Sequence, residues 1–325
     1  MENNNTIFYS DFDMMKKIIK DYSIPVQPVS LTHIDYALKK FPNVFDYEDA
    51  IINARRHIKY CGFNLDQFKS DIHKVTQGII DKIATMDSYK YDFQCRDLPE
   101  TGFTKDRGLK YNRGLHIYNN NNNGKQLVSI DLTKANLQSF INQGVIENCE
   151  YEDFLKKYGE IESEHLLYYI RDSKHLRQII FGNLNAPRQQ QVERIMTEQL
   201  LDTLLEKGIL HIDDIYGYTT DEIILNYTDN VSDLDDTYFK DIYFACSDLG
   251  IKIHTENFIL KKIEPYDFWM KVDPVTNQPY KFKNIPVVYF LQVLKHVYKM
   301  PVESEDCMFL YDDLPCKFVT KLWEE

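Results

Sequence analysis

The stretch that decides the fold runs Gly208-Ile-Leu-His-Ile-Asp-Asp-Ile-Tyr-Gly-Tyr-Thr-Thr-Asp-Glu-Ile-Ile-Leu-Asn-Tyr227. β-Branched and aromatic residues, which favour β-strands, fill two segments of it, Ile209 to Tyr218 and Ile223 to Tyr227. Polar residues collect between these segments, at Thr219-Thr220-Asp221-Glu222. The pattern predicts a β-hairpin that carries the Asp221 carboxylate at its tip.

A second aspartate, Asp131, ends another strand-like run, Gln126 to Ile130, and a helix-like segment, Leu132 to Ile141, follows it at once. If this strand and the hairpin are neighbours in one sheet, Asp131 and Asp221 meet. Two carboxylates on adjacent strands suit a pair of divalent cations that grip a triphosphate and an attacking hydroxyl, because hard cations take oxygen ligands and keep several coordination positions open.

Composition bounds the class of protein. The chain has 325 residues, enough for one large domain or two to three smaller ones. Glycine is scarce, with 12 residues, and the sequence holds no GxGxxG or GxxxxGK motif, which argues against a dinucleotide-binding fold or a glycine-rich phosphate loop. No apolar run reaches the length of a membrane span and the N-terminus lacks signal-peptide features, so we expect an intracellular protein, in the cytoplasm or a host-cell cytoplasm.

Cysteine usage indicates reduced thiols. The six cysteines are scattered and show no CxxC spacing, so the sequence predicts neither a zinc site nor a disulfide framework.

The net charge of −12 opposes nucleic-acid binding, because phosphate repels an acidic surface. Only a local basic groove could support that function. Basic residues gather in three stretches, at 105–113, 171–188 and 252–271.

Helical spacing dominates the first 90 residues. It predicts helices over Met14–Tyr22, Ile34–Phe41, Tyr47–Tyr60 and Leu65–Met86, with Asp46 and Asp71 as plausible N-caps. Further helices are expected over 151–158, 162–181, 188–206 and 237–249, and a pair of strands over 252–271. We expect the asparagine run Asn119 to Asn123 to be a surface loop.

The order of these elements resembles that of palm-domain nucleic-acid polymerases, most closely the small, protein-primed family B DNA polymerases. The resemblance covers roughly residues 108 to 272. It implies an α+β fold, with a central antiparallel sheet backed by helices. It also divides the chain into a helical N-terminal region (1–92), a palm-like domain (93–144 and 183–260), a helical fingers-like insertion (145–182) and a thumb-like C-terminal region (261–325).

The family's first motif is an aspartate that ends a strand and is followed by a turn into a helix. Val128-Ser-Ile-Asp131-Leu-Thr-Lys-Ala-Asn-Leu-Gln-Ser-Phe140 keeps the apolar strand and the aspartate. Asn136 stands where the family has a tyrosine that lies under the incoming sugar. The resemblance therefore implies a nucleotide contact at Asn136 and leaves the choice between DNA and RNA products open.

The second motif is a lysine followed by an asparagine, an aromatic residue and a glycine on one helix. Lys174-His-Leu-Arg-Gln-Ile-Ile-Phe-Gly182 is similar, with Gln178 in place of the asparagine, and it also resembles the Arg-x-x-x-Phe-Gly pattern of family A polymerases. Helical spacing puts Lys174, Arg177, Gln178 and Phe181 on one face. The resemblance implies that the cations hold a triphosphate and that Phe181 stacks under a base pair; an amphipathic helix with a solvated basic face is the alternative.

The third motif, Asp-Thr-Asp-Ser in a hairpin turn, aligns with Thr219-Thr220-Asp221-Glu222. Asp221 keeps the second aspartate, whereas Thr219 replaces the first. The turn also resembles the His-Asp-Glu turn of family A polymerases. An alternative register places Asp213-Asp214 at the turn, as in reverse transcriptases, but the strands around Asp221 are longer and better patterned.

A last segment, Leu260 to Lys271, resembles the part of the family that grips the primer–template duplex. By this resemblance Lys261, Lys262 and Tyr266 would contact phosphates without base specificity. Lysines on an exposed strand also protect a sheet edge against aggregation, which is an equally good explanation for them.

Together these features lead us to expect a template-directed nucleic-acid polymerase, DNA polymerase-like and without a proofreading domain. Asp131 and Asp221 would be catalytic, and Asp131, Asp221 and Glu222 would hold Mg²⁺ or Mn²⁺. A primer–template and nucleoside triphosphates would be the partners, joined by other protein subunits where these complete the enzyme, with no membrane. The alternatives are a catalytically degenerate palm that serves as a structural or regulatory subunit, an RNA polymerase or reverse-transcriptase-like enzyme, and an unrelated protein.

Overall fold

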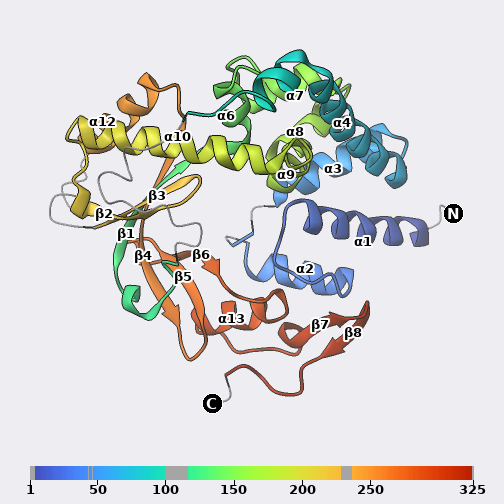
Figure 1. Cartoon of the computed structure of the whole chain (residues 1–325). Coiled ribbons are helices and arrows are strands. Elements are labelled where there is room, and N and C mark those ends of the chain that lie inside the picture. Colours follow the sequence, from blue (N-terminus) through green and yellow to red (C-terminus); the bar gives the residue numbers. More distant parts are fainter. Residues whose placement is uncertain (1–3, 43, 46, 100–115, 228–235, 324–325) are drawn as a thin grey trace. The chain divides into compact units, whose positions relative to one another are not determined.

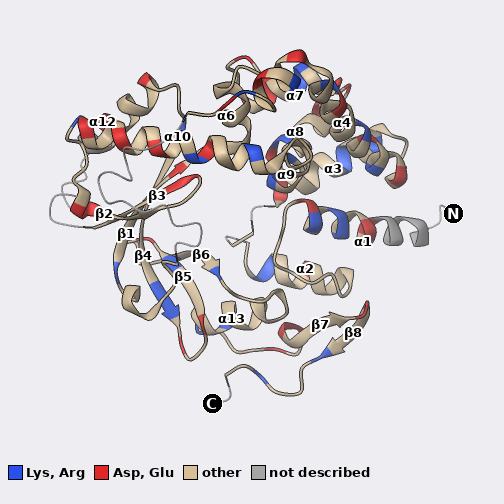
Figure 2. Ribbon diagram, viewed as in Figure 1, with Lys and Arg blue, Asp and Glu red and all other residues tan. Residues whose placement is uncertain are grey.

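A computed structural model describes residues 4–42, 44–45, 47–99, 116–227 and 236–323. The chain divides into two compact units, each built from segments that are distant in sequence (Figure 1). Unit 1 comprises Met1–Ile80, Glu150–Ile180 and Lys283–Glu325, and unit 2 comprises Asp81–Cys149 and Phe181–Phe282. Acidic residues, which outnumber basic ones by 50 to 38, are distributed over both units (Figure 2).

Unit 2 is an α+β unit. Its described residues contain a six-stranded sheet with the order β2-β3-β1-β4-β5-β6, and the pairs from β2 through β5 are antiparallel. The strands are β1 Gln126–Leu132, β2 Ile215–Tyr218, β3 Glu222–Asn226, β4 Ile253–Ile263, β5 Phe268–Val272 and β6 Pro279–Lys283. The strand at 126–130 and the strand pair at 252–271 are thereby confirmed.

Strands β1 to β4 and the helices that connect them follow one another along the chain in a βαββαβ order. Between β1 and β2 the chain runs through α6 (Ala135–Asn142), then through helices of unit 1, and returns by α10 (Ala186–Glu206), which leads into the β2–β3 hairpin. Helix α12 (Asp236–Asp248) connects β3 to β4. Helix α6 follows β1 and packs on α10, which also contacts α12 (Figure 1). Together with the strand order β2-β3-β1-β4, this is the split βαβ arrangement.

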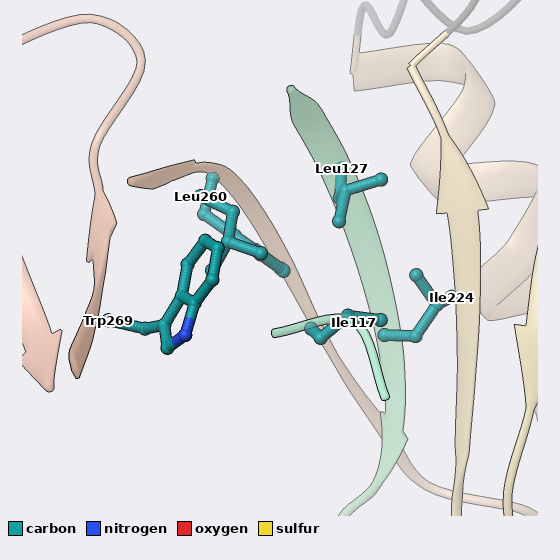
Figure 3. Packing of buried hydrophobic residues seen from close by; sticks show 6 residues of the cluster. Ile117, Leu127, Ile224, Leu260 and Trp269 are labelled. Carbon is teal, nitrogen blue, oxygen red and sulfur yellow. The ribbon is translucent and has the colours of Figure 1, made fainter. Parts of the chain in front are cut away.

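Both faces of the central strands are apolar over much of their length. Val128, Ile130 and Ile223 are buried on the side of the sheet that α10 covers. On the opposite face lies a second cluster of buried side chains, shown in Figure 3 around the Trp269 indole. Its members are Ile117, Leu127, Ile224, Phe258, Leu260 and Trp269.

The asparagine run lies at the surface as expected, except for Asn122, which is buried. Residues Asn120–Asn122 form a 3-10 turn. The Asn122 side chain is 1% exposed and donates hydrogen bonds to the Ile117 carbonyl and the Tyr216 hydroxyl. Since a buried amide needs partners, these bonds hold the segment before β1 over the second cluster.

Unit 1 is mainly helical. Its helices are α1 (Asn4–Asp21), α2 (Leu31–Lys40), α3 (Glu48–Tyr60), most of α4 (Leu65–Thr85), α7 (Tyr151–Gly159), α8 (Glu164–Asp172), most of α9 (Lys174–Gly182) and α13 (Phe290–Val297). A two-stranded sheet of β7 (Met308–Tyr311) and β8 (Leu314–Lys317) completes its described residues. The N-terminal helices agree with the sequence pattern. Among the described helices, none combines the length and the apolar composition that crossing a bilayer requires.

Several expectations need correction. The single helix expected over 162–181 is broken at Ser173, whose hydroxyl accepts from Leu176 N and donates to the Asp21 carbonyl. Asp71 lies inside α4 and is not its N-cap, and Asp46 lies outside the described residues.

The expected domain boundaries also differ from the observed units. A boundary after residue 260 would cut β4, which continues to Ile263 and pairs with β5. The thumb-like region expected at 261–325 therefore begins inside the sheet. Most of the fingers-like insertion, 150–180, belongs to the same unit as the N-terminal helices.

A buried carboxylate ties unit 1 together and gives a stability prediction. Asp21 is 1% exposed, pairs with Lys17 at 2.6 Å and accepts a hydrogen bond of 2.8 Å from the Tyr169 hydroxyl. We expect Tyr169→Phe to lower the free energy of unfolding by about 1.5–3 kcal/mol, because it removes a hydrogen bond to a buried charge.

The matched control is Tyr22→Phe, whose hydroxyl donates to the neutral Tyr169 carbonyl at 2.8 Å. Its loss should be smaller, about 0.5–1.5 kcal/mol. Urea unfolding of both variants provides the measurement, and equal losses would contradict the assignment of a charge-assisted bond.

Candidate active site

The acidic site of unit 2 consists of Asp131, Asp221 and Glu222, where β1 ends and the β2–β3 hairpin turns. The hairpin forms as the sequence predicts, although its first strand is shortened by a 3-10 turn at Ile212–Asp214. Thr219 N donates to the Glu222 carbonyl at 2.8 Å and closes the turn. Strands β1 and β3 are antiparallel neighbours, as the metal hypothesis requires.

The register brings Asp131 directly opposite Glu222. The sequence had led us to expect Asp221, the preceding residue, to meet Asp131. Leu132 N donates to the Asp221 carbonyl at 2.8 Å, so Asp131 and Glu222 form a pair without mutual main-chain hydrogen bonds. In such pairs the Cβ atoms lie about 4.5–5.5 Å apart. Asp131 and Glu222 therefore share one face and one end of the central strands. Asp221 follows in the register across from Leu132, which projects on the face that α10 covers.

Glu222 is held in place from β1. The buried Ser129 hydroxyl donates to Glu222 Oε1 at 2.5 Å. Ser129 and Asp131 are two positions apart on one strand and so project on the same face. The bond fixes one oxygen of Glu222 against the strand that carries Asp131.

The charge of Asp221 affects a further acidic residue, Glu193, which the sequence analysis did not identify. Glu193 of α10 is 9% exposed, and burial, together with the nearby charge of Asp221, raises its pKa to about 7. Thr197, one turn along α10, donates to the Thr220 carbonyl at 2.9 Å and fastens the hairpin turn to the helix. The sequence feature that could have identified Glu193 is its position next to Val192, on the apolar face of the helix expected over 188–206.

Next to the acidic site, on β4, lies a further carboxylate, Glu256, whose charge is balanced by lysines. Glu256 lies opposite Ser129 and is hydrogen-bonded to the buried Lys271, with Lys281 at 3.4 Å. Burial alone would raise the pKa of Glu256, but the two lysines outweigh it and lower that pKa. Glu256 is therefore neutralised by β5 and β6. Acidic residues colour the β2–β3 hairpin and basic ones the β4 and β5 strands in Figure 2.

The expected nucleotide-binding helix is only partly suited to that role. Phe181 is fully buried and packs on Phe140 at 5.4 Å, so its ring is not available to stack under a base pair. Arg177 lies over the Tyr151 ring at 5.7 Å, and burial lowers the pKa of its guanidinium. Lys174 and Gln178 are exposed. Because α9 crosses the division between the units, Lys174, Arg177 and Gln178 belong to unit 1 and Phe181 to unit 2.

The structure places Asn136 within unit 2, in α6, close in sequence to Asp131. Asn136 is half-buried, and its side-chain oxygen accepts from Leu137 N at 3.0 Å.

Lys261, Lys262 and Tyr266 lie at the far end of β4 and in its connection to β5. Lys261 donates to Asn277 at 2.9 Å, Lys262 lies 3.6 Å from Glu264, and Tyr266 stacks on Phe268. His254 is the residue of β4 opposite Asp131, so Lys262 is about 26 Å farther along the strand. The basic stretch at 105–113 lies outside the described residues.

The alternative register is not supported. Asp213 and Asp214 lie in the 3-10 turn before β2, and Asp214 is buried and accepts from His211 N. The hairpin turn itself carries Asp221, as the strand pattern indicates.

The pKa of Glu193 yields a pH-dependent prediction. A carboxyl whose folded pKa is raised destabilises the folded state as pH rises from its unfolded value, 4.5, to about 7. Glu193→Gln should therefore increase the free energy of unfolding at pH 8, by up to about 3 kcal/mol at 1.36 kcal/mol per pKa unit, and by much less near pH 4.5.

Denaturant unfolding across this pH range measures the effect. Glu206→Gln, at an exposed position of the same helix, is the matched control and should leave the pH dependence unchanged. Asp221→Asn should reduce the dependence, because it removes a nearby negative charge. A wild-type profile that is flat between pH 5 and 8 would contradict the burial of Glu193 next to Asp221.

Comparison of this chain with protein-family models, with characterised proteins and with solved structures finds no match. The functional assignment therefore depends on the geometry and chemistry of the described residues.

Proposed function

We propose that unit 2 is a polymerase-like palm that catalyses template-directed nucleotidyl transfer. The observation that carries the proposal is the register of β1 and β3, which puts Asp131 opposite Glu222 and hydrogen-bonds Leu132 to Asp221. Asp131 and Glu222 thereby lie opposite each other on one face, and Asp221 occupies the next register position at the same end of the strands. The βαββαβ order supports the same reading, because a palm places its acids at the end of the first strand and in the following hairpin.

The donors suit Mg²⁺ or Mn²⁺. Every side chain of the acidic site offers carboxylate oxygen, and hard divalent cations prefer oxygen ligands. Asp131, Asp221 and Glu222 would hold the cations, which when bound activate a primer 3′-hydroxyl and neutralise the triphosphate. Burial is the main cause of the raised pKa of Glu193, and the charge of Asp221 adds to it; bound cations would relieve this second contribution.

The chain's own residues would prepare the site before any ligand binds. Ser129 fixes Glu222, and Thr197 fixes the hairpin turn. Both bonds come from regular elements, β1 and α10, so the carboxylates are supported by rigid structure. Fixed ligands of this kind lower the cost of ordering the site during the reaction.

A primer-extension assay on the full chain tests the proposal. With Mg²⁺ or Mn²⁺, labelled primer–templates of DNA and RNA, and both classes of nucleoside triphosphate, we expect extension by the wild type. Asp131→Asn and Asp221→Asn should each reduce the rate by at least about 1,000-fold, because the lost charge stabilisation is worth several kcal/mol.

Asp213→Asn is the matched control, since Asp213 is an exposed aspartate of the same hairpin region but outside the acidic site, and it should retain activity. Circular dichroism and thermal unfolding must show that all variants fold. Full activity in Asp131→Asn would remove this carboxylate from the mechanism.

A catalytically degenerate palm is the second candidate, and one observation favours it. Thr219 stands in place of the first aspartate of the third motif, and its hydroxyl donates to the Glu222 carbonyl at 3.4 Å, within the turn. Stabilisation by Mg²⁺ or Mn²⁺ that depends on Asp131, without any extension, would support this structural or regulatory role over the enzymatic one.

A further inference from the structure

A second, chemically different cluster lies in unit 1, where α3 ends and α4 passes beside it. It consists of His57 and Cys61, one helical turn apart, and Asp71 of α4. Their ligand atoms lie within 4.8 Å of one another, and among the described residues no other three histidine, cysteine or acidic side chains do so. This cluster plays no part in the proposed palm chemistry.

The separations match the edges of a zinc coordination tetrahedron. His57 Nε2 lies 3.1 Å from Asp71 Oδ2, and Cys61 Sγ lies 3.4 Å from each of these atoms. Zinc bonds of about 2.3 Å to sulfur and about 2.0–2.1 Å to nitrogen or oxygen, at tetrahedral angles, give edges of about 3.6 Å with sulfur and about 3.3–3.4 Å without it. An outward adjustment of only about 0.2 Å per edge is therefore required.

The surroundings orient two of the three groups, His57 and Asp71. The His57 ring is buried between Tyr60, at 5.7 Å, and Phe68, at 5.8 Å. Gln67 donates to Asp71 Oδ1 at 2.6 Å and leaves Oδ2 directed at the cluster. Hydrogen bonds from surrounding residues of this kind orient metal ligands and strengthen binding.

We propose that His57 Nε2, Cys61 Sγ and Asp71 Oδ2 bind one Zn²⁺ ion. A thiolate, an imidazole and a carboxylate favour zinc over Mg²⁺, which prefers oxygen alone. Binding releases the thiol proton and moves the imidazole proton to Nδ1, so the +2 ion meets one thiolate and one carboxylate and the complex is neutral. The Asp71 side chain is 21% exposed, so a water molecule can supply the fourth ligand.

The consequence is a clip between two helices of unit 1. The ion would join the C-terminal turn of α3 to the first half of α4 and would add to the packing of Phe68 on His57. Because metal binding to the folded state alone adds to stability, zinc should raise the unfolding temperature of the chain. The competing explanation is a hydrogen-bonded cluster in which Cys61 and His57 donate to Asp71 without a metal.

Metal titration of the full chain separates these explanations. Protein freed of metal by chelator and dialysis is titrated with Zn²⁺ alone by calorimetry, and with Co²⁺ by absorption. We expect one Zn²⁺ per chain, a raised unfolding temperature and a thiolate-to-cobalt absorption band. Cys61→Ser and Asp71→Asn should lose the band or weaken binding by more than about 100-fold, since loss of an orienting partner alone costs about 10–100-fold.

The controls separate this site from other thiols and from the acidic site. Cys316→Ser changes a comparably half-buried thiol of unit 1 and should bind zinc as the wild type does. Asp131→Asn should also retain zinc, so failure of the palm proposal leaves this one standing. Gln67→Ala should weaken binding by about 10–100-fold while keeping the cobalt band, because it perturbs only the orientation of Asp71.

Two results would overturn the proposal. One is less than one Zn²⁺ bound per wild-type chain at a tenfold excess of metal. The other is equal zinc affinity in the wild type and in a Cys61→Ser variant whose circular dichroism is native. Serine preserves the size and hydrogen-bonding capacity of Cys61, so the metal-free variant should fold.

Discussion

The pairing of β1 with a strand on each side is the constraint on which unit 2 depends. β1 runs antiparallel to both β3 and β4, so two registers fix the place of every residue on it. A slip by one residue would turn Asp131 and Ser129 toward α10 and bring apolar side chains to the open end. Leu127 and Val128 are both fully buried although they face opposite sides, so burial alone does not distinguish the two registers there. The pairing of Asp131 with Glu222 at the end of the strand does distinguish the two registers.

Charge explains why this end of the sheet is specialised. Most acidic residues in the described part of the chain are exposed, where water stabilises them, but Glu193 is buried close to Asp221. The charge of Glu256, nearby on β4, is instead neutralised by Lys271 and Lys281. One part of the face is thus compensated from within the protein, whereas the acidic site concentrates negative charge that a divalent cation can balance. The net charge of −12 strengthens the same tendency over the whole chain.

The helical unit uses polar groups differently. The buried Asp21 carboxylate has hydrogen-bond partners from α1 and α8. The Ser173 hydroxyl donates a further hydrogen bond to the main-chain carbonyl of Asp21. The bonds that Tyr169 and Ser173 make to Asp21 join segments about 150 positions apart. They explain why residues 150–180 belong with the N-terminal helices and not with the sheet. A buried polar group without such partners would cost more than it contributes.

Local pattern in the sequence determined the elements themselves. Alternating β-branched and aromatic residues were enough for the hairpin and for the strand that ends at Asp131, and 3.6-residue spacing was enough for the N-terminal helices, because these signals act between near neighbours. The resemblance to palm polymerases pointed to Asp131 and Asp221 as a pair, and the two strands are indeed adjacent. Glu222 was expected as a metal ligand but not as the residue directly across from Asp131.

Only the tertiary structure decided the rest. The burial of Phe181 and Glu193, the division into units, and the meeting of Cys61 with Asp71 depend on which helix faces pack together, and packing joins residues far apart in the chain. A search for CxxC spacing could not find the last of these, because its ligands come from two helices. The sequence by itself therefore determined which groups are present and which strands and helices carry them. Burial and register, which fix the distances and charges between them, arise only when the chain is packed.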